Sequence, residues 1–389
     1  MKVAGDWLSD AGTQAIFAVL HRAGHQAFVV GGAVRDAALG VAVRDVDFAT
    51  DARPDRVLDL AGQADIQAVP TGIDHGTLTL VVSGRGYEVT TFRRDVATDG
   101  RRAVVAFSDD IETDARRRDF TMNALYADAD GLVHDPLGGW PDLLARHVRF
   151  IDDPEQRIRE DALRILRFFR FVAHHGAPQA GIDADGLAAC AALADLVDGL
   201  SAERIGHEMR KLLSAVDPAP AVASMGASGV LGRVAPGAQP ALLAPLVDVE
   251  NGLEPDWMRR ITALGADPEQ LNWRLSKAET KALTDHQRAS GSDEGAAASA
   301  YRHGARAARN LALVRASVLG PLDLHDLETQ IARGVAAKVP VRAADLMDRY
   351  GPGPRLGKAL TALTEAWIAS DFALDRDALL SLPLEDRSD

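Results

Sequence analysis

Two aspartates in the segment RDVDF are the first residues whose spacing points to chemistry. Asp45 and Asp47 stand two positions apart, and Val46 and Phe48 alternate with them. In a strand, the period of two places both carboxylates on one face and both apolar side chains on the other. Two carboxylates held this close repel each other unless a divalent cation lies between them. The pattern predicts a strand that is anchored in a core and presents a cation site to a cleft.

A glycine pair lies just upstream, in GGAVRDAALG. Gly31 and Gly32 predict a turn, and a helix should follow from about Ala33. The first N–H groups of such a helix are free to bind a phosphate, and Arg35 adds a charged donor. The segment lacks the G-x-G-x-x-G spacing of dinucleotide-binding folds, and no GK[ST] of a Walker loop follows. We therefore expect Gly32 and Arg35 to steady phosphates close to the aspartates.

A third carboxylate, Glu88, lies in GYEVTTFRRD, where alternation places it on the same strand face as Thr90. Taken alone, it is also typical of a charged edge strand. If its strand neighbours the first one, Glu88 completes a three-carboxylate cluster with Asp45 and Asp47. Such clusters hold two Mg²⁺ ions about 3.5–4 Å apart, one for an attacking hydroxyl and one for the leaving phosphates. We therefore expect these three residues to be both the metal ligands and the catalytic residues.

Composition limits the class of protein. The chain has 389 residues and is 47% hydrophobic, enough for two or more domains. One cysteine, Cys190, excludes an internal disulfide framework, and MKVAGDWLSD meets charge too early for a secretory signal. We therefore expect a cytoplasmic protein, and no apolar run approaches membrane-spanning length. Because the net charge is −13, any contact with nucleic acid must be local.

Two styles of sequence follow one another along the chain. Up to about residue 135, β-rich runs such as AFVV, TLTLVV and AVVAF alternate with helical stretches, which predicts an α/β head. From Pro141 onward apolar residues recur at helical spacing, and the remainder should be helical. Asp153, which stands before a proline, predicts a helix start. On the ensuing helix Glu160 and Arg164 are four residues apart, in the favourable order for an ion pair.

Five motifs, in this order, resemble the class II nucleotidyltransferases, which include the bacterial tRNA CCA-adding enzymes and the poly(A) polymerases. The motifs are GGAVRD…RDVDFAT, EVTTFRRD, RRDFTMNALYAD, DPLGGWPDL and REDALRILRFFRF, and the likeness continues to about residue 213. The resemblance implies an α+β nucleotidyltransferase head with a mixed β-sheet and helices, followed by an all-α neck, body and tail. The implied divisions are 1–140 for the catalytic head, 141–213 for the neck that selects the base, and 214–389 for the body and tail that bind tRNA.

The resemblance also assigns roles outside the carboxylate cluster. Asp161 and Arg164 would act as an amino-acid template for the incoming base. Adenine and cytosine each place an exocyclic amine beside a bare ring nitrogen, which suits a carboxylate acceptor and a guanidinium donor. Guanine and uracil present the opposite pattern and would leave buried polar groups unpaired. The nucleotide would be contacted by three more arginines, Arg118, Arg167 and Arg170, although packing or a tRNA-phosphate contact stays open for the last two.

Two further segments carry predictions. In RRDFTMNA we expect one helix with Asp119 and Asn123 on a single face, available to the ribose. The segment DVATDGRRAVVAFSDDIETDARR places Asp99, Gly100 and Arg101 at a turn, and the resemblance implies a mobile loop that helps to switch from C to A addition. Its full length favours complete CCA addition.

We interpret the chain as a Mg²⁺-dependent enzyme that restores CCA at tRNA 3′ ends. The terminal ribose hydroxyl would attack the α-phosphorus of CTP or ATP, and pyrophosphate would leave. The expected partners are the acceptor arm and 3′ end of tRNA, with ATP and CTP, and no membrane. The alternatives are a poly(A) polymerase, an enzyme that adds only CC or only A, and, from a different class, an RNA-binding protein without turnover.

Overall fold

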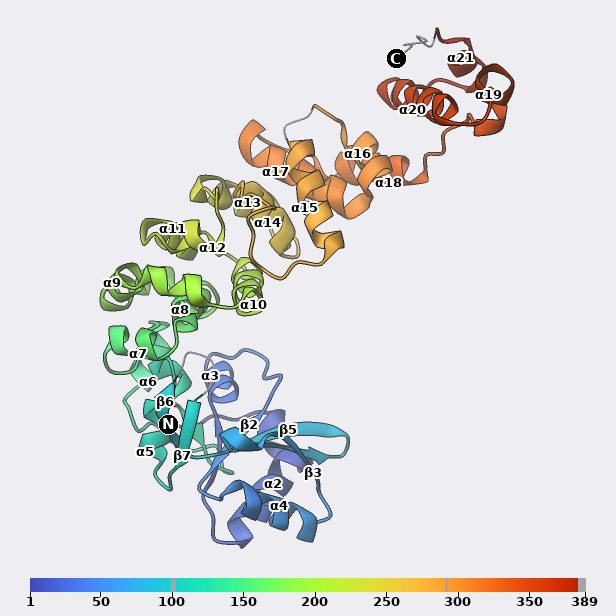
Figure 1. The fold of residues 1–389 in the computed structure, drawn as a ribbon. Helices are drawn as coiled ribbons and strands as arrows, with labels where there is room; N and C mark the ends of the chain where they lie inside the picture. The colour runs from blue at the N-terminus through green and yellow to red at the C-terminus, as the bar shows by residue number, and fades with distance from the viewer. Residues whose placement is uncertain (99–102, 291–292, 384–389) are drawn as a thin grey trace. The chain divides into compact units, whose positions relative to one another are not determined.

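The computed structural model of the protein describes residues 1–98, 103–290 and 293–383 (Figure 1). The chain begins with a mixed β-sheet and helices and continues as helices alone, which confirms the predicted fold class. In these described residues the last strand ends at His134, in agreement with the expected loss of the strand pattern.

The chain forms two compact units. The first consists of Met1–Pro236 and Asn272–Arg274, and the second of Gly237–Leu271 and Leu275–Asp389. The boundaries expected at residues 140 and 213 both lie inside the first unit, so the division into head, neck and body stays a prediction.

A seven-stranded mixed sheet forms the centre of the head, in the strand order β3-β4-β5-β2-β1-β8-β9. The strands are β1 (Ala27–Val30), β2 (Asp47–Thr50), β3 (Gln67–Gly72), β4 (Thr77–Val82), β5 (Arg85–Thr91), β8 (Tyr126–Ala127) and β9 (Val133–His134). The β2–β5 pair is parallel, and the other neighbouring pairs are antiparallel. The parallel register sets Asp47 opposite Glu88. The prediction that their two strands are neighbours is therefore confirmed.

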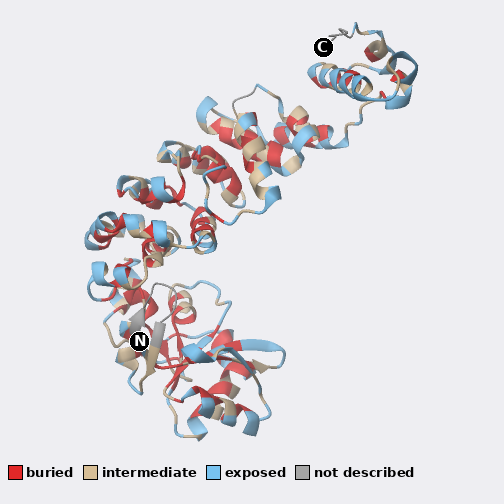
Figure 2. Ribbon diagram, viewed as in Figure 1, coloured by how far each residue is buried: buried red, intermediate tan, exposed pale blue. Residues whose placement is uncertain are grey.

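The alternation predicted for RDVDF holds, because its apolar residues are in the core while its aspartates are exposed. Phe48 is fully buried, and its ring packs edge-on against Phe17 with 5.0 Å between ring centroids. Val46 is also buried. The strand begins only at Asp47, however, so Asp45 precedes it. Figure 2 shows the buried residues along the sheet and on the inner sides of the helices.

In the first unit, helices alternate with the strands of the sheet, and after β9 only helices and 3₁₀ turns follow. They are α1 (Asp6–Ser9), α2 (Ala11–Arg22), α3 (Gly32–Ala38), α4 (Pro54–Gln63), α5 (Ile111–Arg116), α6 (Trp140–Ala145), α7 (Pro154–Glu160), α8 (Leu163–His175), α9 (Ala184–Ala192), α10 (Ala202–Leu213), α11 (Ala219–Ala227) and α12 (Val230–Val234). Short 3₁₀ turns lie at η1 (Ile73–His75), η2 (Thr121–Asn123), η3 (Pro178–Ala180) and η4 (Ala194–Gly199). A separate two-stranded sheet is made by β6 (Arg93–Thr98) and β7 (Ala103–Phe107). The turn predicted at Asp99, Gly100 and Arg101 lies outside the described residues.

The helix predicted to run on from Asp153 is interrupted. Asp153 caps α7 as expected, with its carboxylate accepting from the Gln156 N–H at 2.7 Å. The chain then becomes extended at Asp161, where φ is −153°, and α8 begins at Leu163. The Asp161 side chain accepts from the Leu163 N–H at 3.0 Å. A local side-chain acceptor of this kind competes with the helical bonding pattern, which is the physical reason for the break.

The prediction of a helix for RRDFTMNA is wrong. Phe120 is extended and forms an isolated antiparallel bridge with Phe150, and only the η2 turn follows. Asp119 accepts from its neighbour's N–H, Phe120 N, at 2.9 Å, which favours this non-helical course. Asn123 still meets Asp119, with Nδ2 donating to Oδ1 at 2.9 Å.

The second unit is helical throughout its described residues. Its helices are α13 (Leu243–Glu250), α14 (Trp257–Ala263), α15 (Lys277–Ser290), α16 (Ala296–His303), α17 (Ala305–Leu319), α18 (Leu324–Ala336), α19 (Ala343–Tyr350), α20 (Pro354–Ala369) and α21 (Arg376–Ser381), with a 3₁₀ turn η5 (Pro240–Leu242). Glu250 is buried between Arg259 and Arg260, which donate to its two carboxylate oxygens at 2.6 and 2.7 Å. Among the described residues, no helix has both the length and the apolar character needed to cross a membrane.

Candidate active site

A pocket of about 370 Å³ opens where the sheet of the head meets α3 and the start of α8. All of its lining belongs to the first unit. It is lined by Val30, Gly31, Gly32, Arg35, Asp47, Phe48, Glu88, Thr90, Arg117, Arg118, Asp119, Asn123, Asp161, Arg164, Arg167 and Phe171. Eight of the ten residues predicted for the site are therefore brought to one cavity, and Asp45 and Arg170 are not among its lining.

The carboxylates occupy one wall of this pocket. Asp47 and Glu88 face it from adjacent positions of the parallel β2–β5 pair. Asp45 is exposed, precedes β2 and is not among the pocket's lining residues, so two of the three predicted carboxylates line the pocket. Within the described part of the chain, no three Asp, Glu, His or Cys side chains are gathered closely enough to hold a metal ion.

The electrostatics of Asp47 indicate negative charge that the protein does not fully compensate. Partial removal of water by the pocket walls, and then repulsion from Glu88, raise the pKa of Asp47 to about 6. The nearby Arg118 acts in the opposite direction, and Asp45 adds to the rise. The side chain itself stays open to the pocket. A cation placed beside this pair would therefore be attracted to it.

Gly31 and α3 form a second wall. Gly31 has φ of 71°, in the left-handed region that favours glycine, and it serves as the N-cap of α3. The predicted helix start is thus confirmed to within one residue. Arg35 is buried, and its guanidinium donates to Asn123 Oδ1 at 2.8 Å and to Asp36 Oδ1 at 2.9 Å. Burial lowers the pKa of Arg35, and the charge of Asp36 partly restores it.

Arg118 is held in place by the buried carboxylate of Asp114. Its Nη2 donates to Asp114 Oδ2 at 3.0 Å, and its Nε donates to the Tyr126 hydroxyl at 3.1 Å. Burial alone would raise the pKa of Asp114, but Arg118 and Arg117 hold it at about 2. Asp114 is therefore a fixed anion that positions two pocket arginines.

A chain of hydrogen bonds connects α8 to α3 across the floor of the pocket. Arg167 donates from Nε and Nη2 to Asp119 Oδ2 at 2.8 and 2.5 Å, and Asp119 in turn accepts from Asn123. Asn123 accepts from Arg35. Although burial opposes ionisation of Asp119, Arg167 and Asn123 hold its pKa at about 2. Two cations on different helices are thus fixed relative to each other.

Arg164 is firmly oriented, as the sequence predicted. Its Nη1 donates to Glu160 Oε2 at 2.7 Å and to the Arg157 carbonyl at 2.9 Å, and its Nη2 donates to the Arg117 carbonyl at 3.0 Å. Only a small part of the side chain is accessible, on the pocket side. The ion pair expected between Glu160 and Arg164 is confirmed, and it spans the break between α7 and α8.

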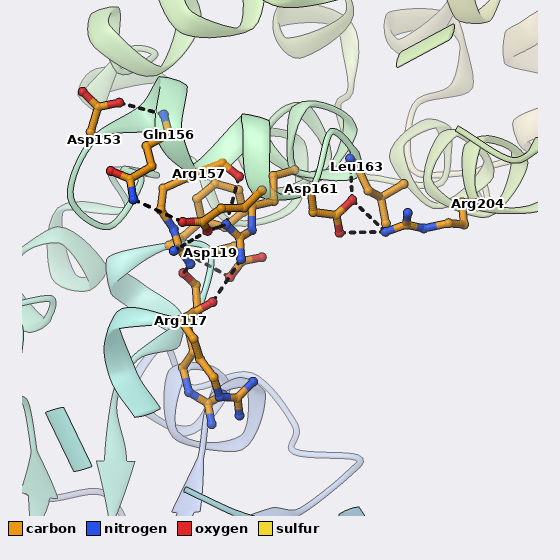
Figure 3. Close-up of polar contacts among 12 residues, drawn as sticks. Arg117, Asp119, Asp153, Gln156, Arg157, Asp161, Leu163 and Arg204 are labelled. Carbon is orange, nitrogen blue, oxygen red and sulfur yellow. Dashed lines mark hydrogen bonds and ion pairs between the residues drawn. The ribbon is translucent and has the colours of Figure 1, made fainter. Parts of the chain in front are cut away.

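Asp161 has a partner that sequence reasoning missed. Arg204, at the start of α10, places Nη2 against both carboxylate oxygens of Asp161 at 2.9 and 2.7 Å (Figure 3). Asp161 and Arg164 both line the pocket, but Asp161 is paired with Arg204. Arg204 is 43 residues away in sequence and was interpreted only as part of a helix start, because no local pattern signals a distant partner. Arg117 was missed as a pocket residue too, although it stands beside Arg118 in the basic run.

Arg170 is not among the residues that line the pocket, and its contact with the nucleotide stays a prediction. Its Nε donates to Glu208 Oε2 at 2.5 Å, and its guanidinium lies 4.6 Å from the centroid of the Phe171 ring. Glu208 is almost fully buried, so this pair holds α8 against α10.

The fold and this pocket define the class of protein as a nucleotidyltransferase. A family model described as the Poly A polymerase head domain matches residues 27–149, and one described as the probable RNA and SrmB- binding site of polymerase A matches residues 181–242. The chain is 31% identical over 391 residues to the CCA-adding enzyme of Limosilactobacillus fermentum, with 94% of each chain covered. The chain belongs to the CCA-adding enzyme family.

Other relatives agree with this assignment over different shares of their length. A CCA tRNA nucleotidyltransferase 1, mitochondrial, from Mus musculus is 40% identical over 204 residues, which cover 52% of this chain and 47% of that protein. The chain thus spans about half the length of this relative and of its human counterpart. The crystal structure of the Bacillus stearothermophilus CCA-adding enzyme in complex with CTP superimposes with a TM-score of 0.69 at 28% identity, and 92% of each chain is covered.

The charge on Asp47 should be visible in the pH dependence of stability. A folded-state pKa above the ordinary value means that the folded protein holds this proton more tightly than the unfolded chain. The associated stability is present below about pH 4 and is lost as the pH rises through about 6. In EDTA, we expect Asp47→Asn to raise the melting temperature at pH 7.5, with a gain that shrinks toward pH 4.

A second variant separates the two main causes of this shift. Glu88→Gln removes the repulsion from Glu88 and should move the window of pH-dependent stability to lower pH. Melting curves of the three proteins between pH 4 and pH 8 provide the measurement. Parallel profiles for wild type and Asp47→Asn would contradict the electrostatic description of the pocket.

Proposed function

We propose that this chain adds C, C and A to the 3′ ends of tRNA with CTP and ATP as substrates, and releases pyrophosphate. The observation that carries the proposal is one pocket in which the Asp47–Glu88 pair of the sheet meets Asp161 and Arg164 of the following helices. Phosphate chemistry and base recognition are thereby available within the reach of a single nucleotide. Similarity to a CCA-adding enzyme along 94% of both chains supports the same substrate class.

The residues of the pocket fit a divalent cation such as Mg²⁺. Carboxylate oxygens are the ligands that Mg²⁺ prefers, and Asp47 and Glu88 present two carboxylates from adjacent strands. The raised pKa of Asp47 means that a positive charge would relieve repulsion there. Asp47 and Glu88 would hold the metal, with Asp45 approaching from two residues upstream. When bound, Mg²⁺ supplies activation of the attacking hydroxyl and neutralises charge on the phosphates.

The triphosphate is bound by the opposite wall. The first N–H groups of a helix have no acceptor within it, and those of α3 begin at Gly32 beside the pocket. Arg35, Arg118 and Arg167 add guanidinium donors, each already fixed by buried polar partners. This preorganisation positions the α-phosphorus for in-line attack by the tRNA 3′ hydroxyl, and pyrophosphate leaves on the side of the arginines.

Base selection falls to the α7–α8 junction. Asp161 offers an acceptor to the exocyclic amine of adenine or cytosine, and Arg164 offers a donor to the adjacent ring nitrogen. Arg164 cannot rotate to suit another base without losing Glu160 and two carbonyl oxygens. Arg204 acts on Asp161 as a positioning residue, because it holds both carboxylate oxygens. GTP and UTP would place a carbonyl oxygen against the Asp161 carboxylate and a ring N–H against the Arg164 guanidinium, so neither pair could form a hydrogen bond.

The wider division of labour follows from this assignment. Residues 1–140 act as the catalytic head, 141–213 as the neck that selects the base, and 214–389 as the body and tail that bind tRNA. The activity takes place in the cytoplasm, in keeping with a single cysteine that is buried.

Two other activities use the same chemistry. A poly(A) polymerase shares the head and the carboxylates, and an enzyme that adds only CC or only A shares the base-selecting residues as well. A protein that binds RNA without turnover is disfavoured, because it has no reason to hold Asp47 and Glu88 together against their repulsion.

The sequence of the product distinguishes these possibilities. Purified protein is given tRNA that lacks its terminal CCA, with Mg²⁺, CTP and ATP, and the extended 3′ ends are sequenced. We expect addition to stop after C, C and A. Long A tails, or products that end after CC, would overturn the proposal in favour of the corresponding relative.

Base selection is tested with variants at Asp161 and its partner. Asp161→Ala should lower the kcat/KM for CTP and ATP by about tenfold or more, because a hydrogen bond to a charged group contributes about 1.5–3 kcal/mol. Arg204→Gln should act in the same direction and mainly through KM, since the acceptor is misplaced but still present. The preference for CTP and ATP over GTP and UTP should fall in both.

Arg159→Gln provides the matched control, because Arg159 forms an exposed pair with Glu155 on α7 and lies outside the pocket. It should keep the wild-type preference. An unchanged preference in Asp161→Ala would contradict the assignment of this residue to the base.

A further inference from the structure

One face of α15 carries a line of cations in a protein whose net charge is −13. Lys277, Lys281, Thr284 and Arg288 are separated by four, three and four residues, so they lie within about 60° of one another around the helix. Lys277, Lys281 and Arg288 are exposed. We call these four residues the α15 stripe. The opposite face of α15, which includes the buried Leu283, packs toward α14 and α17.

The cations of the stripe differ from most others of the second unit in how they are paired. Elsewhere in this unit, most arginines are bound to carboxylates, in the pairs Arg259–Glu250, Arg260–Glu250, Arg302–Glu294, Arg306–Asp256, Arg309–Glu328, Arg333–Asp371 and Arg376–Asp345. Among residues 1–98, 103–290 and 293–383, no carboxylate lies within ion-pair distance of Lys277 or Arg288. Lys281 pairs with Asp285, yet 76% of its side chain is exposed.

The surface around the stripe is slightly hollowed. The stripe lines a shallow groove with Leu275, Thr280 and Asp285. The ammonium and guanidinium groups are donors that suit phosphate oxygens, whereas the hydroxyls of Thr280 and Thr284 already donate to the carbonyls of Ser276 and Thr280. The three cations extend over about 16 Å along the helix and do not converge on one point. This spacing fits an extended polyanion better than a single small anion.

We propose that the α15 stripe binds the phosphate backbone of tRNA. The proposal rests on the proposed function, which makes tRNA the substrate, and it identifies residues that hold it outside the catalytic pocket. The stripe also lies outside residues 181–242, which match the RNA-binding family model. A local cluster of exposed cations allows an acidic protein to bind a polyanion, since affinity for phosphates depends on the contacts made and not on net charge.

The experiment measures the affinity for tRNA lacking CCA as a function of salt concentration. Each phosphate contact contributes roughly 0.7–0.9 to the slope of log K against log salt. The triple variant K277Q/K281Q/R288Q should therefore lose about 2–3 from the slope of the wild type and should bind roughly tenfold or more weakly at low salt. Circular dichroism and melting curves verify that the variant is folded, as expected for exposed residues.

The matched control removes three charges from the same unit where each guanidinium is already paired. The variant R309Q/R333Q/R376Q changes the net charge equally, and because exposed pairs contribute little to stability it should stay folded. It should keep the wild-type slope. A wild-type slope in the stripe variant, or an equal loss in both triple variants, would overturn the proposal.

Failure of this inference can be distinguished from failure of the proposed function. Wild type that adds CCA and a stripe variant that binds tRNA normally would refute the stripe alone. Long A tails made by a wild type whose tRNA binding still depends on the stripe would refute CCA addition alone. A loss of binding confined to anionic phospholipid vesicles, with tRNA binding intact, would assign the stripe to a different partner and overturn the proposal.

Discussion

The parallel pairing of β2 with β5 is the constraint on which the site depends. It sets Asp47 directly opposite Glu88, so two carboxylates stay close although their charges repel. Burial of Phe48 and its neighbours in the same strand is favourable and offsets the free-energy cost of this repulsion. Partial burial and then this repulsion raise the pKa of Asp47, and a perturbed carboxyl of this kind in a pocket is typical of a functional site.

The remaining side chains of the pocket are held by a different device. Arginines of the head and of α8 are each bound to a buried or partly buried acid: Arg118 to Asp114, and Arg167 to Asp119. Such pairs cost desolvation energy and are retained where orientation matters. The same device joins segments far apart in the sequence, since Arg204 of α10 holds Asp161 at the α7–α8 junction. In the proposed function, phosphate binding and base selection would use these preorganised cations.

Much of the fold and part of the site could be predicted from the sequence. Strand alternation placed Asp47 in a cleft and Phe48 in the core, and helix chemistry located the start of α3 to within one residue and Asp153 as the N-cap of α7. Failures arose where a distant or competing partner decided the outcome. The side chain of Asp161 breaks its helix and pairs with Arg204, 43 residues away, and Arg170 pairs with Glu208, 38 residues away. Local patterns do not carry information about such partners.

The central claim is that Asp47 and Glu88 hold a divalent cation with the nucleotide. Mn²⁺ in place of Mg²⁺ allows this to be measured directly, by electron paramagnetic resonance of free Mn²⁺ during titration with protein in the presence of CTP. The account predicts uptake of Mn²⁺ by the wild type and an affinity reduced at least tenfold in both Asp47→Asn and Glu88→Gln. Equal uptake by the wild type and the two variants would contradict it.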